Sequence, residues 1–438
     1  MVEWSRYNFL INSPKCGRLL YNSFTNGILE LDESIYDDFV NLAASDKAAE
    51  KLLENFSEEE QSYLKENYIL SHDEMLLEHM HHQSLQRIYS QKHLSLTIAP
   101  TQNCNFKCTY CFENFRTSQY MSDETEAALI RYLNQQKEKN GLEVISLTWY
   151  GGEPLLVPER LQSLGTKIKE TGLTIQNSGI ITNGYLLDKL HLEVLKEIDV
   201  STIQITIDGF QQQHDQRRPL KSGKGTFERI IQNIDAFFAN GYHRTMFLAI
   251  RINVDQTNKK EYASIYHWLK QRYPFDNYRI YPGWVQKGDD DTLKSDCFSR
   301  KEITDFSIEL YKKDQILTDK LFPKDNCQQC LVRNPYNMIL GPKGEIYKCY
   351  EDIGDETLVV GNIQNEPVWS NHDLITKYAV GLDHFQDQQC RSCAYLPICH
   401  GGCPKRRYEN KYDNKKNDYC TPFKGRIEEY IEILKDRF

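Results

Sequence analysis

The sequence predicts an α/β protein built around a partial (βα)6 barrel of the TIM type. We expect a small winged-helix-like α+β domain at residues 1–92, the barrel at 93–310, and a loop-rich domain at 311–438. Three observations predict this arrangement: strand and helix patterns alternate from residue 93, unusual short motifs follow several strands, and eight of the 13 cysteines lie between residues 327 and 420.

The first segment has the signals of a short antiparallel sheet followed by helices. Apolar and polar residues alternate on both sides of Asn26-Gly27, a dipeptide typical of hairpin turns. Helical periodicity follows. Strands are expected over residues 6–13 and 17–32, and helices over 33–44 and 47–70. This order of elements favours a small winged-helix-like domain.

The middle segment repeats strand, loop and helix. Strands are expected at residues 94–100, 144–150, 174–183, 200–208, 245–255 and 277–282. Helices are expected at residues 122–140, from 158, and at 186–198, 226–240 and 259–273. Such alternation implies right-handed βαβ units and a parallel sheet. Six units form an incomplete barrel instead of a closed eightfold one.

Each unusual motif of this segment follows a predicted strand. Cys104 follows the first strand, and Gly151-Gly152-Glu153-Pro154 follows the second. Thr182-Asn183-Gly184 follows the third, and Asp208-Gly209 closes the fourth. Any one of them could be an ordinary turn. Because parallel barrels carry their sites at the carboxyl ends of their strands, four such motifs predict an active site there.

Composition predicts a cytoplasmic protein without a membrane partner. Hydrophobic residues make up 40% and charged residues 26% of the chain. No apolar run reaches the roughly 18 residues that a membrane span needs, and the first residues lack a signal-peptide pattern. Thiols stay reduced in the cytoplasm, so the cysteines are interpreted as metal ligands instead of disulfides.

The negative charge is concentrated in the first domain. Residues 1–92 contain 8 basic and 16 acidic side chains, whereas the whole chain has a net charge of −9. An acidic domain argues against nucleic acid as its partner and would tolerate a basic peptide. A solvated acidic surface without a partner explains the charge equally well.

Cys104, Cys108 and Cys111 place three thiols within eight residues. A structural zinc site normally has four protein ligands. An iron–sulfur cluster of the [4Fe–4S] type is usually held by four cysteines, so three would leave one iron for an external ligand.

With Tyr110, the "GGEP" motif and "TIDGFQQQHDQRR" at 206–218, residues 94–285 resemble the radical SAM superfamily. The resemblance implies that the open iron binds S-adenosylmethionine (SAM) and that a 5′-deoxyadenosyl radical forms. It also implies these SAM contacts: Gly151, Gly152, Glu153 and Pro154 around the ammonium, and Thr206, Asp208 and Arg217 or Arg218 near the ribose or carboxylate, with Tyr110 and Asn183 nearby.

The C-terminal cysteines resemble the SPASM domain, which binds two auxiliary [4Fe–4S] clusters. The spacing Cys390-x2-Cys393-x5-Cys399-x3-Cys403-x16-Cys420 carries this resemblance. It implies three clusters in all. One auxiliary cluster would take Cys327, Cys330, Cys349 and Cys403, and the other would take Cys390, Cys393, Cys399 and Cys420. A zinc ribbon would explain only four of these cysteines, and Cys16 and Cys297 have no assigned role.

Radical SAM enzymes with SPASM domains mostly modify peptides or proteins. The N-terminal domain resembles the leader-recognition element of ribosomal-peptide maturases, in which a precursor's leader adds as a strand. The resemblance implies hydrogen abstraction from a precursor peptide and a cysteine thioether crosslink, with flavodoxin or ferredoxin as electron donor. The domain could instead be a stabilising extension.

Two other functions remain open. The first is an anaerobic sulfatase-maturing enzyme, which oxidises Cys or Ser to formylglycine. In that family an Asp directly follows the cysteine that corresponds to Cys349, whereas this chain has Tyr350 there, with Glu351 and Asp352 displaced. The second is a non-catalytic iron–sulfur electron carrier or scaffold.

Overall fold

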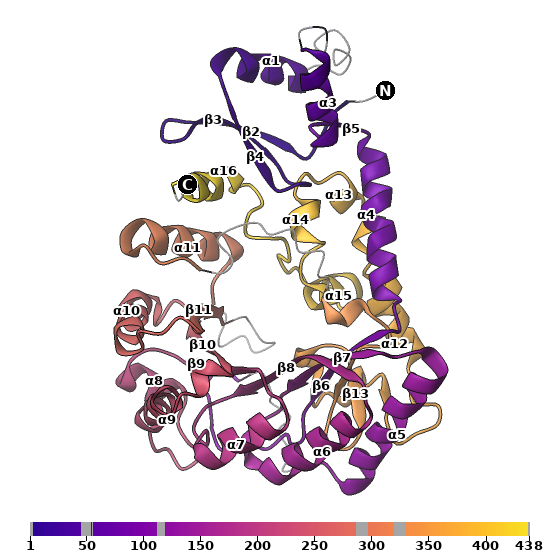
Figure 1. The fold of residues 1–438 in the computed structure, drawn as a ribbon, viewed down its shortest axis with the longest axis vertical. Coiled ribbons are helices and arrows are strands. Elements are labelled where there is room, and N and C mark those ends of the chain that lie inside the picture. Colours follow the sequence, from indigo (N-terminus) through magenta and orange to yellow (C-terminus); the bar gives the residue numbers. More distant parts are fainter. Residues whose placement is uncertain are drawn as a thin grey trace. The chain divides into compact units, whose positions relative to one another are not determined.

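The computed structural model of the chain describes residues 3–44, 54, 56–111, 119–285, 297–318 and 330–436. The chain forms two compact units (Figure 1). The first unit comprises Met1–Ile88, Ser299–Arg333 and Ala379–Phe438, and the second comprises Tyr89–Phe298 and Asn334–Tyr378. The first unit therefore combines segments from both ends of the chain, and the division at residues 92 and 310 stays a prediction. In the described segments, no helix has the length and apolar character that crossing a membrane requires.

The second unit is built on a nine-stranded sheet in the order β11-β10-β9-β8-β7-β6-β12-β13-β14. Its strands are β6 His93–Ile98, β7 Val144–Trp149, β8 Thr174–Thr182, β9 Thr202–Ile207, β10 Phe247–Val254, β11 Tyr278–Trp284, β12 Met338–Leu340, β13 Glu345–Tyr347 and β14 Gly361–Asn362. Strands β6 to β11 are parallel, which confirms the six-unit α/β barrel. The pairing of β12 with β6, which extends this sheet, was not predicted.

Helices connect the parallel strands. They are α5 Asp123–Asn140, α6 Pro158–Glu170, α7 Lys189–Glu197, α8 Gln211–Arg217, α9 Phe227–Ala239 and α10 Tyr262–Arg272, and α12 His372–Thr376 follows β14. Helix α5 begins as predicted, because the Ser122 side chain accepts a hydrogen bond from the Thr125 N–H. On β9, Ile203, Ile205 and Ile207 are fully buried on one face. The alternate face of β9 carries polar residues and ends at the site.

The first unit begins with a three-stranded antiparallel sheet in the order β2-β3-β4. Its elements are β1 Glu3–Trp4, β2 Asn8–Ser13, β3 Gly17–Asn22, β4 Gly27–Leu31, α1 Glu33–Ala44, α3 Glu58–Glu66, β5 Leu70–Ser71 and α4 Asp73–Ile88. The predicted strands and first helix are present. Of the predicted helix at 47–70, only residues 58–66 are helical in the described part, as α3, and β5 begins at its last residue. Residues 47–53 and 55 lie outside the described residues.

Both faces of this N-terminal sheet are buried inside the first unit. Leu20 on β3 packs with the α1 and α3 residues Phe39 and Leu64. Its neighbours Leu19 and Tyr21 face the opposite way, and pack with C-terminal helices of the same unit. These helices are α11 Arg300–Asp314, α14 Leu396–Cys399 and α16 Ile427–Lys435. The N-terminal sheet is thus part of a core that is completed by the last residues of the chain.

Candidate active site

The cysteine loop that follows β6 is fastened by a second loop. Cys104 is buried, and its sulfur accepts a hydrogen bond from the Phe106 N–H at 3.4 Å. Cys108 and Cys111 are partly exposed. Backbone bonds join residues 105–109 to the segment after α8, including Lys107 N to Pro219 O at 2.9 Å. The α8 segment therefore sets the position of the cysteines.

The spacing of these thiols differs from that of a single-ion site. Among the described residues, no three His, Cys, Asp or Glu side chains gather closely enough to hold one metal ion. A [4Fe–4S] cluster attaches each thiolate to a different iron, so its ligands stand farther apart than the ligands of one zinc ion. The cluster ligands in this loop therefore stay a prediction from the sequence.

The paired glycines at the end of β7 lie directly against the cysteine loop. Gly152 N–H donates to Thr101 O at 3.1 Å, and Glu153 N–H donates to Asn103 O at 2.8 Å. A Cβ atom would stand 2.3 Å from Thr101 O if it were added at Gly151, and 2.2 Å from Asn103 O at Gly152. Only glycine permits this approach, which explains the motif physically.

Glu153 joins the ends of two neighbouring strands. Its carboxylate is 1% exposed and accepts hydrogen bonds from Leu155 N–H, Thr182 Oγ1 and Asn183 N–H. Burial raises the pKa of Glu153, and these three donors oppose that effect. Pro154 begins a short 3-10 turn after it. The predicted contact of Glu153 with the SAM ammonium stays a prediction, and the side chain already connects β7 to β8.

Asn183 brings the end of β8 to the cysteine loop. Its Nδ2 donates to Asn105 Oδ1 at 2.7 Å and lies 3.9 Å from Cys104 Sγ. Its Oδ1 accepts from the Tyr185 N–H at 3.0 Å. The motif is therefore more than a turn, because its side chain contacts the segment that carries the predicted cluster ligands.

Tyr110 is the centre of a hydrogen-bond network above β9 and β10. Its hydroxyl donates to Asp208 Oδ1 at 2.8 Å. The same oxygen accepts from Arg218 Nη1 at 2.7 Å and from Asn253 Nδ2 at 2.8 Å. Burial raises the pKa of Tyr110, so the hydroxyl stays protonated. The aromatic residue of the cysteine motif thereby fixes the loop to two strand ends.

Arg217 is held between two acids. Its Nε donates to Asp208 Oδ2 at 2.8 Å, and its Nη1 donates to Asp255 Oδ2 at 2.6 Å. Burial alone would lower the pKa of Arg217, but the two carboxylates outweigh it and raise the pKa. The guanidinium also lies 4.9 Å from the centre of the Tyr110 ring. This ion-pair network orders the predicted SAM-binding rim.

The two arginines retain donors for a bound anion. Within the described part of the chain, Arg217 Nη2 and Arg218 Nε are buried and have no hydrogen-bond partner. Buried donors of this kind normally have acceptors. Thr206 lies near the end of β9, two residues before Asp208. The donor set therefore fits the carboxylate or ribose hydroxyls of SAM.

A neutral, buried histidine contacts the backbone of this network. His214 is fully buried, its Nδ1 accepts from Asp208 N–H at 3.3 Å, and its Nε2 lies 3.0 Å from Thr226 Oγ1. Burial and the two neighbouring arginines lower the pKa of His214 well below its ordinary value. The neutral ring therefore positions the Asp208 backbone.

Three residues of this network were not among the predicted site residues. They are His214, Asn253 and Asp255. The sequence contained a usable signal for two of them, because "NVDQTN" at 253–258 follows the fifth strand just as the other motifs follow the first four. His214 could not be distinguished from an ordinary surface residue of α8 without its buried contacts.

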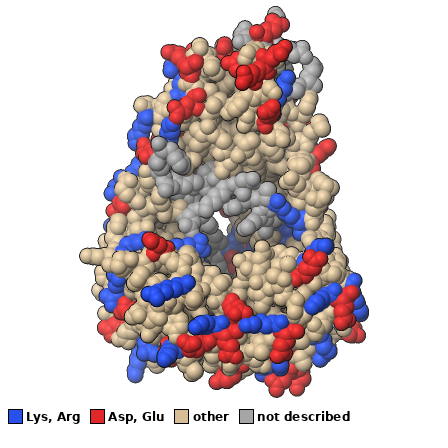
Figure 2. Space-filling model, viewed as in Figure 1, with Lys and Arg blue, Asp and Glu red and all other residues tan. Residues whose placement is uncertain are grey.

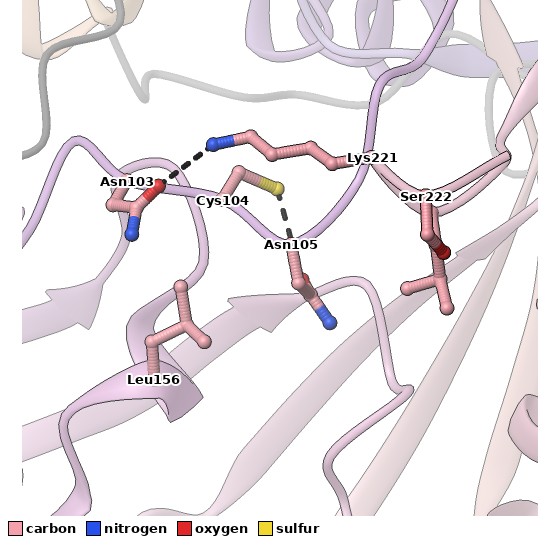
Figure 3. A pocket seen from close by; sticks show the side chains of 7 residues that line it. Asn103, Cys104, Asn105, Leu156, Lys221 and Ser222 are labelled. Carbon is pink, nitrogen blue, oxygen red and sulfur yellow. Dashed lines mark hydrogen bonds between the residues drawn. The ribbon is translucent and has the colours of Figure 1, made fainter.

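A cavity of about 300 Å³ opens beside Cys104 (Figure 3). It is lined by Asn103, Cys104, Asn105, Leu156, Leu220, Lys221 and Ser222. Lys221 Nζ donates to Asn103 Oδ1 at 2.9 Å. The cavity thus gives access to the side of the loop that carries Cys104. Leu156, which follows Leu155, also lines it.

Four C-terminal thiols gather in the first unit. Cys399 interacts electrostatically with Cys420, Cys390 and Cys393, and burial raises the pKa of the Cys399 thiol to about 11. These are the four residues predicted to hold one auxiliary cluster, and a donor set of four buried or partly buried thiols fits that group. The individual ligand assignments stay predictions.

The other predicted auxiliary site is described only in part. Cys330 interacts electrostatically with Cys403 inside the first unit. Cys349 lies in the second unit, two residues after β13, and Cys327 lies outside the described residues. This second set of ligands therefore remains a prediction from the sequence.

The family comparison agrees with this geometry. Residues 98–269 match the family model described as the Radical SAM superfamily. These residues are therefore similar to the radical SAM family, whose members use a [4Fe–4S] cluster and SAM. A cysteine-type anaerobic sulfatase-maturating enzyme of Clostridium perfringens is 26% identical over 367 residues, which cover 76% of this chain and 94% of that protein. The chain is thus similar to radical SAM proteins over residues 98–269 and to sulfatase-maturating enzymes over most of its length.

Solved structures of two proteins share the fold. The structure of native anSMEcpe with bound AdoMet and Cp18Cys peptide has a TM-score of 0.58 at 21% identity, and covers 79% of this chain and 97% of that chain. Streptococcus suis SuiB bound to S-adenosylmethionine has a TM-score of 0.54 at 18% identity, covering 95% and 99%. A further SuiB structure, bound to precursor peptide SuiA, has a TM-score of 0.50 at 17% identity, covering 92% and 95%.

Proposed function

We propose that this protein is a radical SAM enzyme that modifies a ribosomally made precursor peptide and forms a cysteine thioether crosslink. Cluster and SAM together supply the radical that abstracts hydrogen from the substrate, and a one-electron donor such as flavodoxin or ferredoxin supplies the reducing electron. The chain's own residues hold this chemistry in place: Tyr110, Asp208 and Arg218 order the SAM-binding rim, and Gly152 sets the cysteine loop against it.

The N-terminal sheet is the observation that carries the proposal. The match to anSMEcpe leaves about a fifth of this chain uncovered, whereas the match to SuiB covers 95%. The sheet has two edge strands, β2 and β4, and an edge strand can accept an extended peptide by main-chain hydrogen bonds. A leader peptide bound there would direct the rest of the precursor to the barrel.

The charge of this domain suits a basic leader. Acidic side chains gather over α1 and α3, as Figure 2 shows. Helix α3 alone begins with Glu58, Glu59 and Glu60, which are all exposed. Electrostatic steering between opposite charges raises association rates and weakens as salt shortens the Debye length, from about 10 Å at 0.1 M to about 3 Å at 1 M.

Formylglycine formation is the second candidate, because the Clostridium perfringens relative is a sulfatase-maturating enzyme. The surroundings of Cys349 argue against it. Asp352 is fully buried, accepts from the Cys349 N–H at 3.2 Å and from the Tyr378 hydroxyl at 3.0 Å, and thus closes a turn. Tyr350, which occupies the position of that family's Asp, lies 3.1 Å from Thr97 Oγ1 through its hydroxyl. A phenol cannot replace a carboxylate as a base at neutral pH.

The two candidates predict different products from a cysteine-containing peptide encoded beside the gene. A thioether removes two hydrogen atoms from the peptide, leaves no thiol for alkylation and creates no aldehyde. Formylglycine reacts with a hydrazide probe. We expect the first result by mass spectrometry, with faster turnover of the full precursor than of its leaderless form. A hydrazide-reactive product, or equal turnover of both peptides, would contradict the proposal.

The leader interaction can be tested with the intact enzyme. The isolated leader peptide, added in trans, should compete with the precursor, and its affinity should fall when salt is raised from 0.1 to 1 M. A leader of the same composition in scrambled order is the control. If both leaders compete equally, charge alone explains the binding and strand addition is wrong.

A further inference from the structure

Two cationic side chains contact the set of four thiols of Cys390, Cys393, Cys399 and Cys420 in the first unit. The first is Arg407, on α15 Pro404–Tyr412. Its Nη1 lies 3.4 Å from Cys390 Sγ, and its Nη2 donates to Asp387 Oδ2 at 2.8 Å. The side chain is 9% exposed. Arg407 is therefore a buried guanidinium that divides its donors between a carboxylate and a sulfur.

The second cation, Lys424, contacts a different sulfur of these four thiols. Lys424 Nζ donates to Cys420 Sγ at 3.6 Å. The two cations thus contact two different sulfurs. Among the hydrogen bonds that the structure describes, the Asp387 side chain is the only carboxylate that accepts from either cation.

In the cysteine loop of the barrel, the hydrogen-bond donors described near Cys104 are neutral, while Arg218 interacts electrostatically with Cys108. Cys104 Sγ accepts from the neutral Phe106 N–H, and the neutral amide of Asn183 lies 3.9 Å away. Hydrogen bonds and net charge around the sulfurs set the reduction potential of an iron–sulfur cluster. A cluster with four thiolates becomes more negative by one charge on reduction, so neighbouring cations stabilise its reduced form.

We propose that Arg407 and Lys424 raise the reduction potential of the [4Fe–4S] cluster that Cys390, Cys393, Cys399 and Cys420 would hold. With the cluster bound, the two cations would offset part of the negative charge that it gains on one-electron reduction.

The test is an anaerobic redox titration of the reconstituted full-length enzyme, followed by electron paramagnetic resonance, without peptide. Arg407→Gln and Lys424→Gln should each lower one midpoint potential, with about a tenfold loss in the equilibrium constant for reduction, or ~59 mV for one electron. Arg407→Lys should restore most of the shift. Repeating the titration with Cys104, Cys108 and Cys111 replaced by Ala assigns the shift to an auxiliary cluster.

Lys411→Gln is the matched control. Lys411 lies on the same helix as Arg407 and its Nζ donates to Gly381 O instead of a sulfur, so this change removes a charge without a sulfur contact. The proposal is wrong if the double variant keeps all midpoint potentials, or if Lys411→Gln shifts them equally. Lys424 is exposed, so its variant decides the outcome even if Arg407→Gln loses iron. Because no peptide is present, failure here is distinct from failure of the proposed function.

Discussion

Gly152 has no space for a side chain. A Cβ atom there would meet three backbone atoms of residues 102 and 103 within 2.6 Å, and backbone cannot rotate away as a flexible side chain can. The geometry ties one glycine to the position of three predicted cluster ligands. At the scale of single residues, the site therefore depends on the missing side chain of Gly152 as much as on the polar groups around Tyr110.

Gly152→Ala should therefore displace the cysteine loop. Overpacking of this kind costs about 1–3 kcal/mol of folding stability, and the displaced loop should lower the rate of SAM cleavage. Iron content and 5′-deoxyadenosine production measure the effect. Gly179→Ala on β8 is the control, because a Cβ atom there meets nothing closer than 3.6 Å. Equal losses in both variants would show that the close approach is unimportant.

His214 predicts an acid sensitivity of the barrel. An unfolded histidine takes up a proton below a pH of about 6.5, whereas burial keeps folded His214 neutral to much lower pH. Below pH 6.5 the unfolded state therefore binds one more proton, and the free energy of unfolding falls as the pH falls.

His214→Gln should reduce this pH dependence. The measurement is the urea midpoint of the reconstituted enzyme at pH 7.5 and 5.5, under anaerobic conditions. His372→Gln, at an exposed position, is the control. A difference between the two pH values that is unchanged in His214→Gln would contradict this assignment.

At the scale of elements, the N-terminal sheet has two structural partners. Its Leu20 face meets α1 and α3, and its Leu19 and Tyr21 face meets α11 and α16. Removal of the whole domain would expose buried residues such as Ile431 to water. A truncation therefore cannot separate leader binding from stability, which is why the tests above use the intact chain.

Ile431→Ala should destabilise the first unit by about 2–5 kcal/mol, because Ile431 lies on α16 and is fully buried against the N-terminal sheet. Anaerobic thermal unfolding measures this change. Leu434→Ala, at a partly buried position of the same helix, should have a smaller effect. A chain that lacks residues 1–92 but unfolds at the unchanged temperature would contradict the shared core.

At the scale of the whole molecule, the predicted radical cluster and one predicted auxiliary cluster belong to different compact units. The loop of Cys104 lies in the second unit, and Cys390 and Cys393 lie in the first. Chemistry at one site should therefore survive damage to the other, provided that both units fold.

Replacing Cys390 and Cys393 with Ala should leave SAM cleavage measurable and abolish the modified peptide. The expected iron loss is about a third, because one of three [4Fe–4S] clusters is removed. Replacing Cys104, Cys108 and Cys111 should also remove about a third of the iron but eliminate SAM cleavage. Full peptide modification by the first variant would exclude an essential role for that cluster.

Local patterns predicted the barrel because each parallel strand and helix is specified by its own periodicity. The motifs at four strand ends were found for the same reason, since topology alone brings them to one rim. The pairing of β12 with β6 could not be predicted, because three-residue strands have almost no pattern and their partner lies over 200 residues away. The contacts of His214 and Arg407 likewise depend on tertiary packing.

The shared core of the first unit has a consequence for synthesis of the chain. The strand that contains Leu19 and Tyr21 leaves the ribosome before the barrel, yet the α16 residues that cover it, such as Ile431, leave after the barrel. The β6–β11 part of the barrel can be completed in between from consecutive segments. One apolar face of the N-terminal sheet therefore stays uncovered while several hundred residues are translated. A chaperone that shields that face during this interval would raise the yield of the enzyme more than one that acts on the barrel.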